Sequence, residues 1–359
     1  MEPRNFLADR PPIQHVPIVC IGAGGIVRDA HLPAYRMAGY EVHSVHDRDE
    51  TRARALAADF AIPHVRSTLD EAVRLAPPGS VFDVAVPASS IHEVLARLPA
   101  RAPALVQKPF GENLAHARTL LGLCREKELR AAVNFQLRWA PYIVAARERI
   151  AAGEIGALHD MEVRVTVFTP WHLWTFLEGL PRMEILYHSV HYVDLVRSFL
   201  GEPHGVWAST VGHPKHPKLA STRTTIALDY GPRVRATITT NHGHEFGPRH
   251  QESYVKWEGT RGAIKATLGL LMDYPKGSPD SLEMCRLDAA GTIGDWEPVP
   301  FSGSWYPHAF IGSMGSMLRF STGESSELPT AVEDAFKTMA VVEAAYESAA
   351  RGSTPVPEA

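Results

Sequence analysis

The chain has 359 residues, of which 45% are hydrophobic and 21% are charged. This length exceeds what one hydrophobic core usually serves, so two domains are expected. The formal net charge of -4 gives no excess of basic residues for nucleic acid. No apolar run approaches the roughly 20 residues that span a bilayer, so we expect no membrane partner either.

The cysteines indicate a reducing compartment. Cys20, Cys124 and Cys285 are too few and too scattered for a disulfide framework or a cysteine metal site. The first twelve residues contain charges and prolines but no apolar signal core, so export is not indicated. We therefore expect a cytoplasmic protein.

The N-terminal part alternates short apolar runs with helix-like stretches. Strands are expected at 18–21, 41–46, 81–86, 104–106 and 130–133, with helices at 51–60, 69–75, 90–98 and 114–127. Strict alternation predicts a doubly wound parallel sheet covered on both faces, an α/β domain of the Rossmann type. Ligands of such sheets bind beyond the carboxyl ends of the strands.

The pattern changes after Pro141 and a predicted helix that ends near Ala152. Strand-like alternation is found at 160–168, 205–211, 222–228, 234–240, 253–258 and 263–267, and helices are expected at 184–200 and 330–350. This predicts an α+β domain with a largely antiparallel open sheet. We place the first domain at 1–134 and the second, for substrate binding and oligomerisation, at 135–359.

A glycine-rich turn between the first strand and the next helix indicates a dinucleotide site. Such a turn brings backbone N–H groups against a pyrophosphate, and a carboxylate after the second strand holds a ribose. Asp47 stands at the required separation, which favours NAD, while Arg48 leaves NADP open. Val27 occupies the position of the usual third glycine. The candidate cofactor residues of the turn are Gly22, Gly24, Gly25 and Ile26.

Lys108 follows the fifth predicted strand, at the same sheet edge as the glycine turn. A partly desolvated lysine beside a nicotinamide has a lowered pKa and can exchange a proton with a substrate hydroxyl. The alternative is a solvated loop lysine, the commonest fate of this residue type. On position alone, Lys108 is an acid/base candidate.

The predicted helix 184–200 carries a second group of polar residues. Tyr187, His191 and Asp194 are spaced i, i+4, i+7, which places them on one face, while His188 is turned to the side. Such a face can offer an imidazole for proton transfer. A histidine satisfied inside a core remains the alternative.

The 18 histidines raise the question of a metal site, above all His188 and His191 with the later His242, His244 and His250. No cysteine or dense carboxylate cluster completes a recognisable ligand spacing, so no metal is expected. His242 and His244 are two apart on a predicted strand. This spacing favours a pocket lining or a polar surface.

Aromatic residues gather between strand and helix in the second domain. Trp171, Trp174 and Phe176 lie in an irregular stretch. Their faces can stack on the C–H faces of sugar rings, or they can anchor the loop to the domain. Both alternatives stay open.

Taken together, these segments resemble the Gfo/Idh/MocA family of NAD(P)-dependent sugar and polyol oxidoreductases over nearly the whole chain. The resemblance lies in the glycine turn followed by His31-Leu32-Pro33, in Asp83-Val84-Ala85-Val86-Pro87 with His92, in Gln107-Lys108-Pro109, in Asn134-Phe135-Gln136-Leu137-Arg138, in the helix with His191 and Asp194, and in 257–262. It implies cofactor contacts for Pro87, His92 and Lys108. We count Arg138, Trp171, Trp174, His188, Asp194 and His242 as candidate substrate contacts.

The resemblance also assigns catalysis. The family's Glu-Lys-Pro lysine, which is catalytic or orients the substrate, corresponds to Lys108. In the later motif His191 and Asp194 match, but Tyr187 replaces an aspartate and Ser189 a glycine, and Gln107 replaces the usual glutamate. Two acidic positions are thus neutral, and we count Tyr187 with the active site.

The expected reaction is oxidation of a secondary hydroxyl of a sugar, glycoside or polyol, with hydride passing to a nicotinamide. Lys108 and His191 would surround that hydroxyl, and which of them is the base stays open. Two alternatives remain, a transient-redox glycoside-processing enzyme and a non-catalytic NAD-binding sensor. The family resemblance also implies a homodimer or homotetramer formed through the open sheet face.

Overall fold

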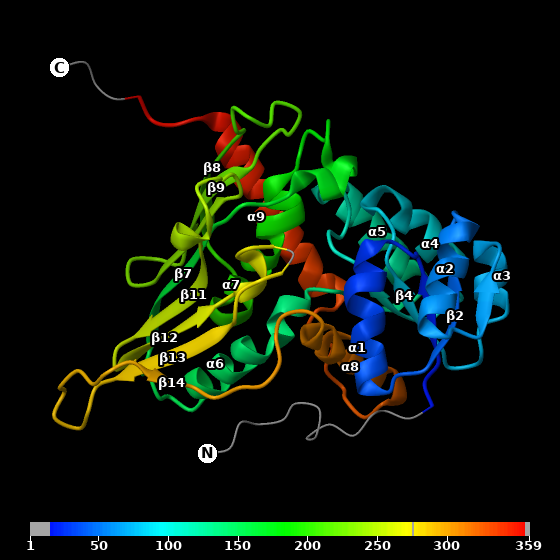
Figure 1. Cartoon of the computed structure of the whole chain (residues 1–359), viewed down its shortest axis with the longest axis horizontal. Helices are drawn as coiled ribbons and strands as arrows, with labels where there is room; N and C mark the ends of the chain where they lie inside the picture. Colours follow the sequence, from blue (N-terminus) through cyan, green and yellow to red (C-terminus); the bar gives the residue numbers. More distant parts are fainter. Residues whose placement is uncertain (1–14, 275, 356–359) are drawn as a thin grey trace. The chain divides into compact units, whose positions relative to one another are not determined.

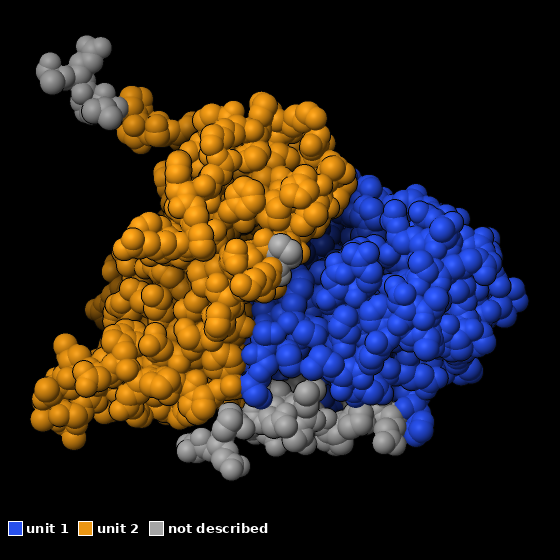
Figure 2. All heavy atoms as spheres, in the orientation of Figure 1, with its two compact units in different colours: residues 1–141, 302–339 blue, residues 142–301, 340–359 orange. Residues whose placement is uncertain are grey.

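A computed structural model describes residues 15–274 and 276–355 of the chain. The chain forms two compact units, one of residues 1–141 and 302–339, the other of residues 142–301 and 340–359 (Figure 2). The chain therefore returns to the first unit late in the sequence, whereas the two predicted domains are continuous ranges. The expectation about the first twelve residues lies outside the described part. No helix of the described part is long and apolar enough to cross a membrane.

The first unit holds a parallel sheet of six strands in the order β3-β2-β1-β4-β5-β6 (Figure 1). The order reverses between β1 and β4, and the crevice at such a switch point is where doubly wound sheets bind ligands. The predicted Rossmann-type sheet is confirmed, although β3 was not predicted. The strands are β1 (Ile18–Ile21), β2 (Val42–His46), β3 (His64–Arg66), β4 (Val81–Val84), β5 (Pro103–Val106) and β6 (Arg130–Val133).

Three helices of the first unit begin at residues whose side chains satisfy a backbone N–H group. Asp49 accepts from the N–H of Arg52 at the start of α2, and Thr68 and Asn113 cap α3 and α5 in the same way. The helices are η1 (Val27–His31), α1 (Leu32–Ala38), α2 (Glu50–Phe60), α3 (Leu69–Arg74), α4 (Ile91–Arg97), α5 (Leu114–Glu126) and α8 (His308–Thr322), with short turns η2 (Ala88–Ser90) and η3 (Gln136–Trp139). The sequence patterns did not predict α8, whose Phe310 and Met314 join the same core as Ile18.

The second unit holds an eight-stranded sheet in the order β14-β13-β12-β11-β7-β10-β9-β8. Only the β7 and β10 pair is parallel, so the prediction of a largely antiparallel sheet is confirmed. The two strands at one end, β13 and β14, were not predicted. The strands are β7 (Leu158–Thr166), β8 (Gly205–Val211), β9 (Arg223–Asp229), β10 (Arg235–Asn241), β11 (Glu252–Gly259), β12 (Gly262–Thr267), β13 (Ser281–Arg286) and β14 (Glu297–Pro298).

One face of this sheet is packed and the other is open. Alternate residues such as Val163, Ile238 and Trp257 are fully buried, and Phe199 of α7 packs its ring 5.2 Å from the Trp257 ring. The helices and turns of this part are α6 (Pro141–Ala151), η4 (Trp171–Leu177), η5 (Ile185–Ser189), α7 (Val190–Leu200), η6 (Pro248–His250), η7 (Gly269–Leu271) and α9 (Val332–Arg351).

Candidate active site

The carboxyl ends of the parallel strands bring the predicted cofactor residues to one edge of the first unit. Gly22 donates its N–H to the carbonyl of His46 over 2.7 Å, which joins the end of β1 to the end of β2. The backbone N–H of Gln107 donates to the carbonyl of Val84 over 2.8 Å, which joins the ends of β5 and β4. The glycine turn, Asp47 and Lys108 therefore all follow strand ends at the same edge.

The turn after β1 needs glycine for two different reasons. Gly22 has a φ of +113°, and a Cβ there would lie 2.2 Å from the carbonyl oxygen of Ala85, so only glycine fits. At Gly24 a Cβ would meet nothing within 4 Å, so the backbone faces open space. The next helix starts here, because the Gly24 carbonyl accepts from Val27 and Arg28. An open backbone at a helix start fits a pyrophosphate.

Asp47 is fixed by backbone donors. Its carboxylate accepts from the N–H of Ala23 over 2.7 Å and from the N–H of Asp49 over 2.8 Å. It therefore stands beside the glycine turn, where a ribose hydroxyl would be held in a dinucleotide. The guanidinium of Arg48 instead donates to Ser90 Oγ of η2 over 3.3 Å. These residues fit NAD.

The remaining predicted cofactor contacts follow β4 or line the turn. Ile26 is half-buried and packs against the core of the first unit. Pro87 is exposed just before η2, and His92 is exposed on α4. Their contacts with a cofactor stay predictions.

Lys108 is half-buried, and burial lowers the pKa of its ammonium group from 10.5 to about 8. Its neighbours at the strand ends are buried amides. No described residue hydrogen-bonds the side-chain oxygen of Gln107 after β5 or that of Asn134 after β6. Buried acceptors without partners are costly unless a donor reaches them, so this edge fits a bound group that carries N–H or O–H donors.

Arg138, a predicted substrate contact, is engaged inside the first unit. Its Nη2 lies 2.6 Å from a carboxylate oxygen of Asp334, and Nη1 donates to the carbonyl of Pro329 over 2.9 Å. The guanidinium thus connects η3 to the first turn of α9 and to the segment that precedes it. This geometry favours a structural role, and a substrate contact stays a prediction.

In the second unit, the predicted helix 184–200 is continuous, but its first part is a π turn at Ile185–Ser189. His191 and Asp194 of the following α7 are buried. Tyr187 is half-buried and packs near Met183, with its ring 6.0 Å from the Phe176 ring. The packing alternative for Tyr187 therefore has a structural basis, and its catalytic role stays a prediction.

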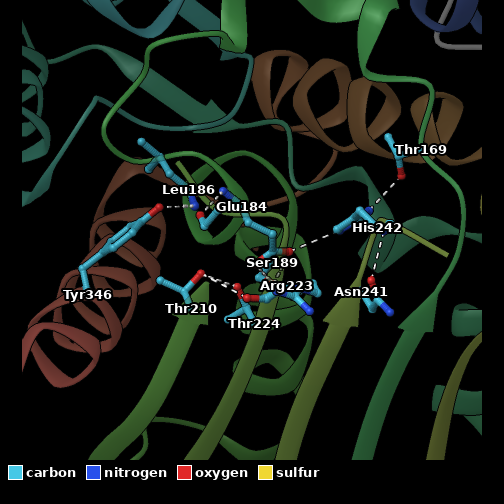
Figure 3. A network of polar contacts seen from close by, with 12 residues as sticks. Thr169, Glu184, Leu186, Ser189, Thr210, Arg223, Thr224, Asn241, His242 and Tyr346 are labelled. Atoms are coloured by element: carbon cyan, nitrogen blue, oxygen red, sulfur yellow. Dashed lines mark hydrogen bonds and ion pairs between the residues drawn. The ribbon is translucent and has the colours of Figure 1, made fainter. Parts of the chain in front are cut away.

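Glu184, which sequence reasoning did not single out, lies at the centre of a buried polar network in the second unit (Figure 3). Its Oε1 is 3.3 Å from Nε2 of His242, and the Ser189 hydroxyl donates to the same carboxylate over 2.9 Å. The other ring nitrogen of His242 is 2.9 Å from Thr169 Oγ1. No local pattern reveals a pair 58 residues apart in the sequence.

The aromatic residues predicted to contact substrate adjoin this network. Trp171 packs edge-on against His188 at 5.3 Å and against His242 at 5.5 Å between ring centroids. Trp174 lies 5.5 Å from the ring of Tyr274. His242 itself is buried and both of its ring nitrogens are engaged, and its direct contact with the substrate stays a prediction.

The described residues contain no group of three or more histidine, cysteine or acidic side chains arranged to hold a metal ion. The three cysteines are free, and Cys20 and Cys124 are buried.

Two sequence models of one family match the chain. The first, described as an oxidoreductase family with an NAD-binding Rossmann fold, matches residues 16–135, and the second, the GFO/IDH/MocA C-terminal domain, matches residues 143–265. The chain belongs to the Gfo/Idh/MocA family. It is an NAD-binding oxidoreductase, as the glycine turn and Asp47 predict.

Relatives with known names support the same class of enzyme. A D-apiose dehydrogenase from Rhizobium rhizogenes is 27% identical over 88% of this chain and 90% of its own length. A D-apiose dehydrogenase from Paraburkholderia graminis is 28% identical over 93% and 88%. An oxidoreductase from Agrobacterium radiobacter, solved with NAD+, L-tartaric acid and magnesium, has a TM-score of 0.77 at 24% identity and covers 95% of this chain and 98% of its own. This last likeness confirms the fold.

Proposed function

We propose that this oxidoreductase oxidises a secondary hydroxyl of a neutral sugar or polyol to a ketone, with NAD+ as acceptor. The observation that carries the proposal is the strand edge that joins an NAD-type turn to Lys108, whose pKa is lowered to about 8 by burial. The names of the relatives, two of them D-apiose dehydrogenases, support a sugar substrate. D-Apiose is therefore the first compound to test.

The bound NAD+ supplies a hydride acceptor at C4 of its nicotinamide. The protein has to remove the hydroxyl proton and stabilise the developing alkoxide. With a pKa of about 8, Lys108 is partly neutral at slightly alkaline pH and can accept that proton. We propose that His191 donates a hydrogen bond to the same oxygen, and that Tyr187 helps to select an uncharged substrate.

A substrate screen tests this function. Purified enzyme is mixed with NAD+ and, in turn, D-apiose, other aldoses, inositols and glycosides, and the absorbance of NADH is followed. Net NADH formation with one class of carbohydrate is the expected result. Product formation without net NADH would instead indicate transient redox, and binding without either would indicate a sensor.

Two further assignments belong to the proposal. We infer a cytoplasmic enzyme, because the three cysteines are free. We also infer a homodimer or homotetramer formed through the open face of the second unit's sheet. The support for the oligomer is the family resemblance together with Trp207, which is 50% exposed on that face.

A further inference from the structure

Glu184 is a charged side chain with no exposure to solvent. Burial by itself raises the pKa of its carboxyl group. Hydrogen bonds from His242, Thr224 and Ser189 act in the opposite direction and outweigh it, so that the pKa is lowered. Glu184 is therefore ionised at neutral pH. A buried carboxylate needs hydrogen-bond donors at its oxygens.

An ionised Glu184 decides where His242 carries its proton. The carboxylate only accepts, so Nε2 of His242, 3.3 Å away, has to be the protonated nitrogen. The other nitrogen is then left to Thr169, whose Oγ1 is 2.9 Å away. Glu184 and Thr169 together hold the imidazole in one orientation and one tautomer.

The π turn makes this arrangement possible. In Ile185–Ser189 the N–H of Val190 bonds to the carbonyl of Ile185, five residues earlier. The same spacing brings the hydroxyl of Ser189 to both carboxylate oxygens of Glu184, at 2.9 and 3.0 Å. In a regular α-helix, residues five apart point in different directions, so this contact depends on the wider turn.

The far side of His242 meets His188 and Trp171, which are expected from the sequence to contact the substrate. The His188 ring lies 4.6 Å from the His242 ring at an angle of 56°, and Trp171 packs edge-on against both rings. His188 is half-buried, whereas both His242 and Trp171 are buried. His242 therefore forms the back of a small aromatic wall that has His188 on its accessible side.

We propose that Glu184 is a positioning residue for carbohydrate recognition: through His242, which packs against the buried Trp171, it fixes the half-buried His188, whose imidazole takes a hydroxyl of the sugar. An imidazole nitrogen suits a hydroxyl of a neutral polyhydroxy compound, and Trp171, which is 7% exposed, supports the two imidazole rings from within the core. This inference rests on the proposed function, because it deepens the account of substrate binding at the same site.

The test compares Glu184→Gln with the wild type in steady-state kinetics. The amide keeps the shape of the side chain, removes its charge and can donate as well as accept, so it no longer dictates which ring nitrogen of His242 carries the proton. We expect KM for D-apiose, or for the best sugar of the screen, to rise about tenfold, with kcat within about threefold. KM for NAD+ should stay within about twofold, since the cofactor turn belongs to the other unit. A purely structural pair would lower the melting temperature and leave this KM unchanged.

Glu343→Gln is the matched control. Glu343 forms an ion pair with Arg182 in the same unit, with oxygens 2.5 and 2.7 Å from the guanidinium nitrogens, and neither residue belongs to the aromatic wall. All three kinetic constants should stay within about twofold of the wild type. Should Glu184→Gln fail to fold, Ser189→Ala removes one donor to the carboxylate and should raise the sugar KM by about threefold. Unchanged sugar KM in whichever of the two variants folds overturns the inference.

Calorimetric titration of the NAD+ complex with the sugar separates this inference from the proposed function. A wild type that binds the sugar without forming NADH refutes the dehydrogenase, while weaker binding by the variant still supports the positioning role. A wild type that turns over the sugar, with unchanged binding in the variant, refutes the positioning role alone. Absence of both binding and turnover for every carbohydrate refutes both.

Discussion

Lys108 shows how burial prepares a single residue for chemistry at a cost in stability. Its folded pKa of about 8 lies below the ordinary 10.5, so the fold disfavours the protonated form. Below pH 8 this cost is present in full, and it shrinks as the pH rises from 8 to 10.5. The difference between these two pKa values corresponds to at most about 3 kcal/mol of unfolding free energy.

Replacing Lys108 by methionine should therefore separate activity from stability. We expect kcat to fall by about 100-fold, because the proton acceptor is lost, and NAD+ affinity to change by less than about threefold. The melting temperature at neutral pH should rise by a few degrees, since an ammonium group no longer has to be buried. Calorimetry and steady-state kinetics check the two results.

The pH profile of the wild type supplies the control. If neutral Lys108 is the base, kcat/KM for oxidation should rise toward a plateau above about pH 8, and the variant should lack this limb. A rate that falls through the same range would assign the base to another group. It would leave Lys108 as a hydrogen-bond donor.

Asp47 makes the choice of cofactor testable. Its carboxylate accepts from Ala23 and Asp49 and adds a negative charge where a 2′-phosphate would lie. We expect kcat/KM with NAD+ to exceed that with NADP+ by about 100-fold, and Asp47→Asn to reduce this ratio by at least about tenfold. Arg48 donates to Ser90, and a preference of the wild type for NADP+ would mean that it leaves this partner.

At the residue scale, the sequence was sufficient to place candidate residues that directly follow a strand. Gly22, Asp47 and Lys108 each follow an apolar run, and the parallel sheet gathers them by its topology alone. Glu184 could not be found in this way, because its partner His242 is 58 residues distant and neither lies in a local motif. The pairing of Glu184 with His242 depends on how the end of β10 lies against the start of the helix. No periodicity in the sequence reveals this arrangement.

At the element scale, the bounds of helix 184–200 were predicted, but the π turn within it was not. The π turn at Ile185–Ser189 shifts the angular spacing that a regular helix gives to Tyr187 and His191. Tyr187 packs against the cluster around Met183 and Trp171. Its spacing in the sequence therefore predicts less about its direction than it would in a regular helix.

Tyr187→Phe tests whether the phenol takes part in catalysis. Phenylalanine keeps the ring that packs near Phe176 and removes only the hydroxyl. We expect an unchanged melting temperature and a kcat/KM about tenfold lower, the effect of one lost neutral hydrogen bond. Unchanged kinetics on the true substrate would reduce Tyr187 to a packing residue.

Helix α8 escaped prediction because two glycines interrupt its pattern. Both lie close to other side chains: a Cβ on Gly312 would lie 2.6 Å from Cβ of Trp139, and one on Gly315 would lie 2.6 Å from the hydroxyl of Tyr40, which would have to shift. Glycine is unfavourable within a helix by up to about 1 kcal/mol relative to alanine. The loss of helix propensity is offset by the close approach of α8 to Trp139 and Tyr40. The sequence pattern does not reveal this approach.

Gly312→Ala should therefore destabilise the protein although alanine favours helices. We expect a fall of several degrees in melting temperature, as is usual for overpacking of about 1–3 kcal/mol. Gly122→Ala in α5 is the control, because a Cβ there meets nothing within 4 Å and the melting temperature should rise slightly. A rise in both variants would mean that Trp139 moves aside without cost.

At the scale of the whole molecule, the two sheets were predicted but the division of the chain was not. Residues 302–339 return to the first unit and 340–359 to the second, so α9 begins in one and ends in the other. Composition and turn signals mark where an element ends. They do not show which earlier element a late segment packs against, because that depends on contacts between residues far apart in the sequence, such as Tyr40 with Ile311.

The open face of the eight-stranded sheet carries exposed apolar side chains at one end. Its cross-strand partners run from Trp207 on β8 through Ala227 and Thr237 to Glu162 and Lys256. Trp207 and Val211, 50% and 47% exposed, share this face at one end of the sheet. An exposed aromatic and an exposed aliphatic side chain side by side on a sheet face are typical of an interface between protein chains.

Light scattering coupled to gel filtration checks the proposed oligomer. We expect a mass of two or four times the 39.4 kDa of one chain. Trp207→Arg should shift the protein toward the monomer, because it places a charge within the apolar part of the face. Ile293→Arg is the control, since Ile293 is 76% exposed between β13 and β14, outside this face, and its replacement should leave the mass unchanged. A wild type of 39.4 kDa at micromolar concentration would refute the oligomer and leave Trp207 for some other contact.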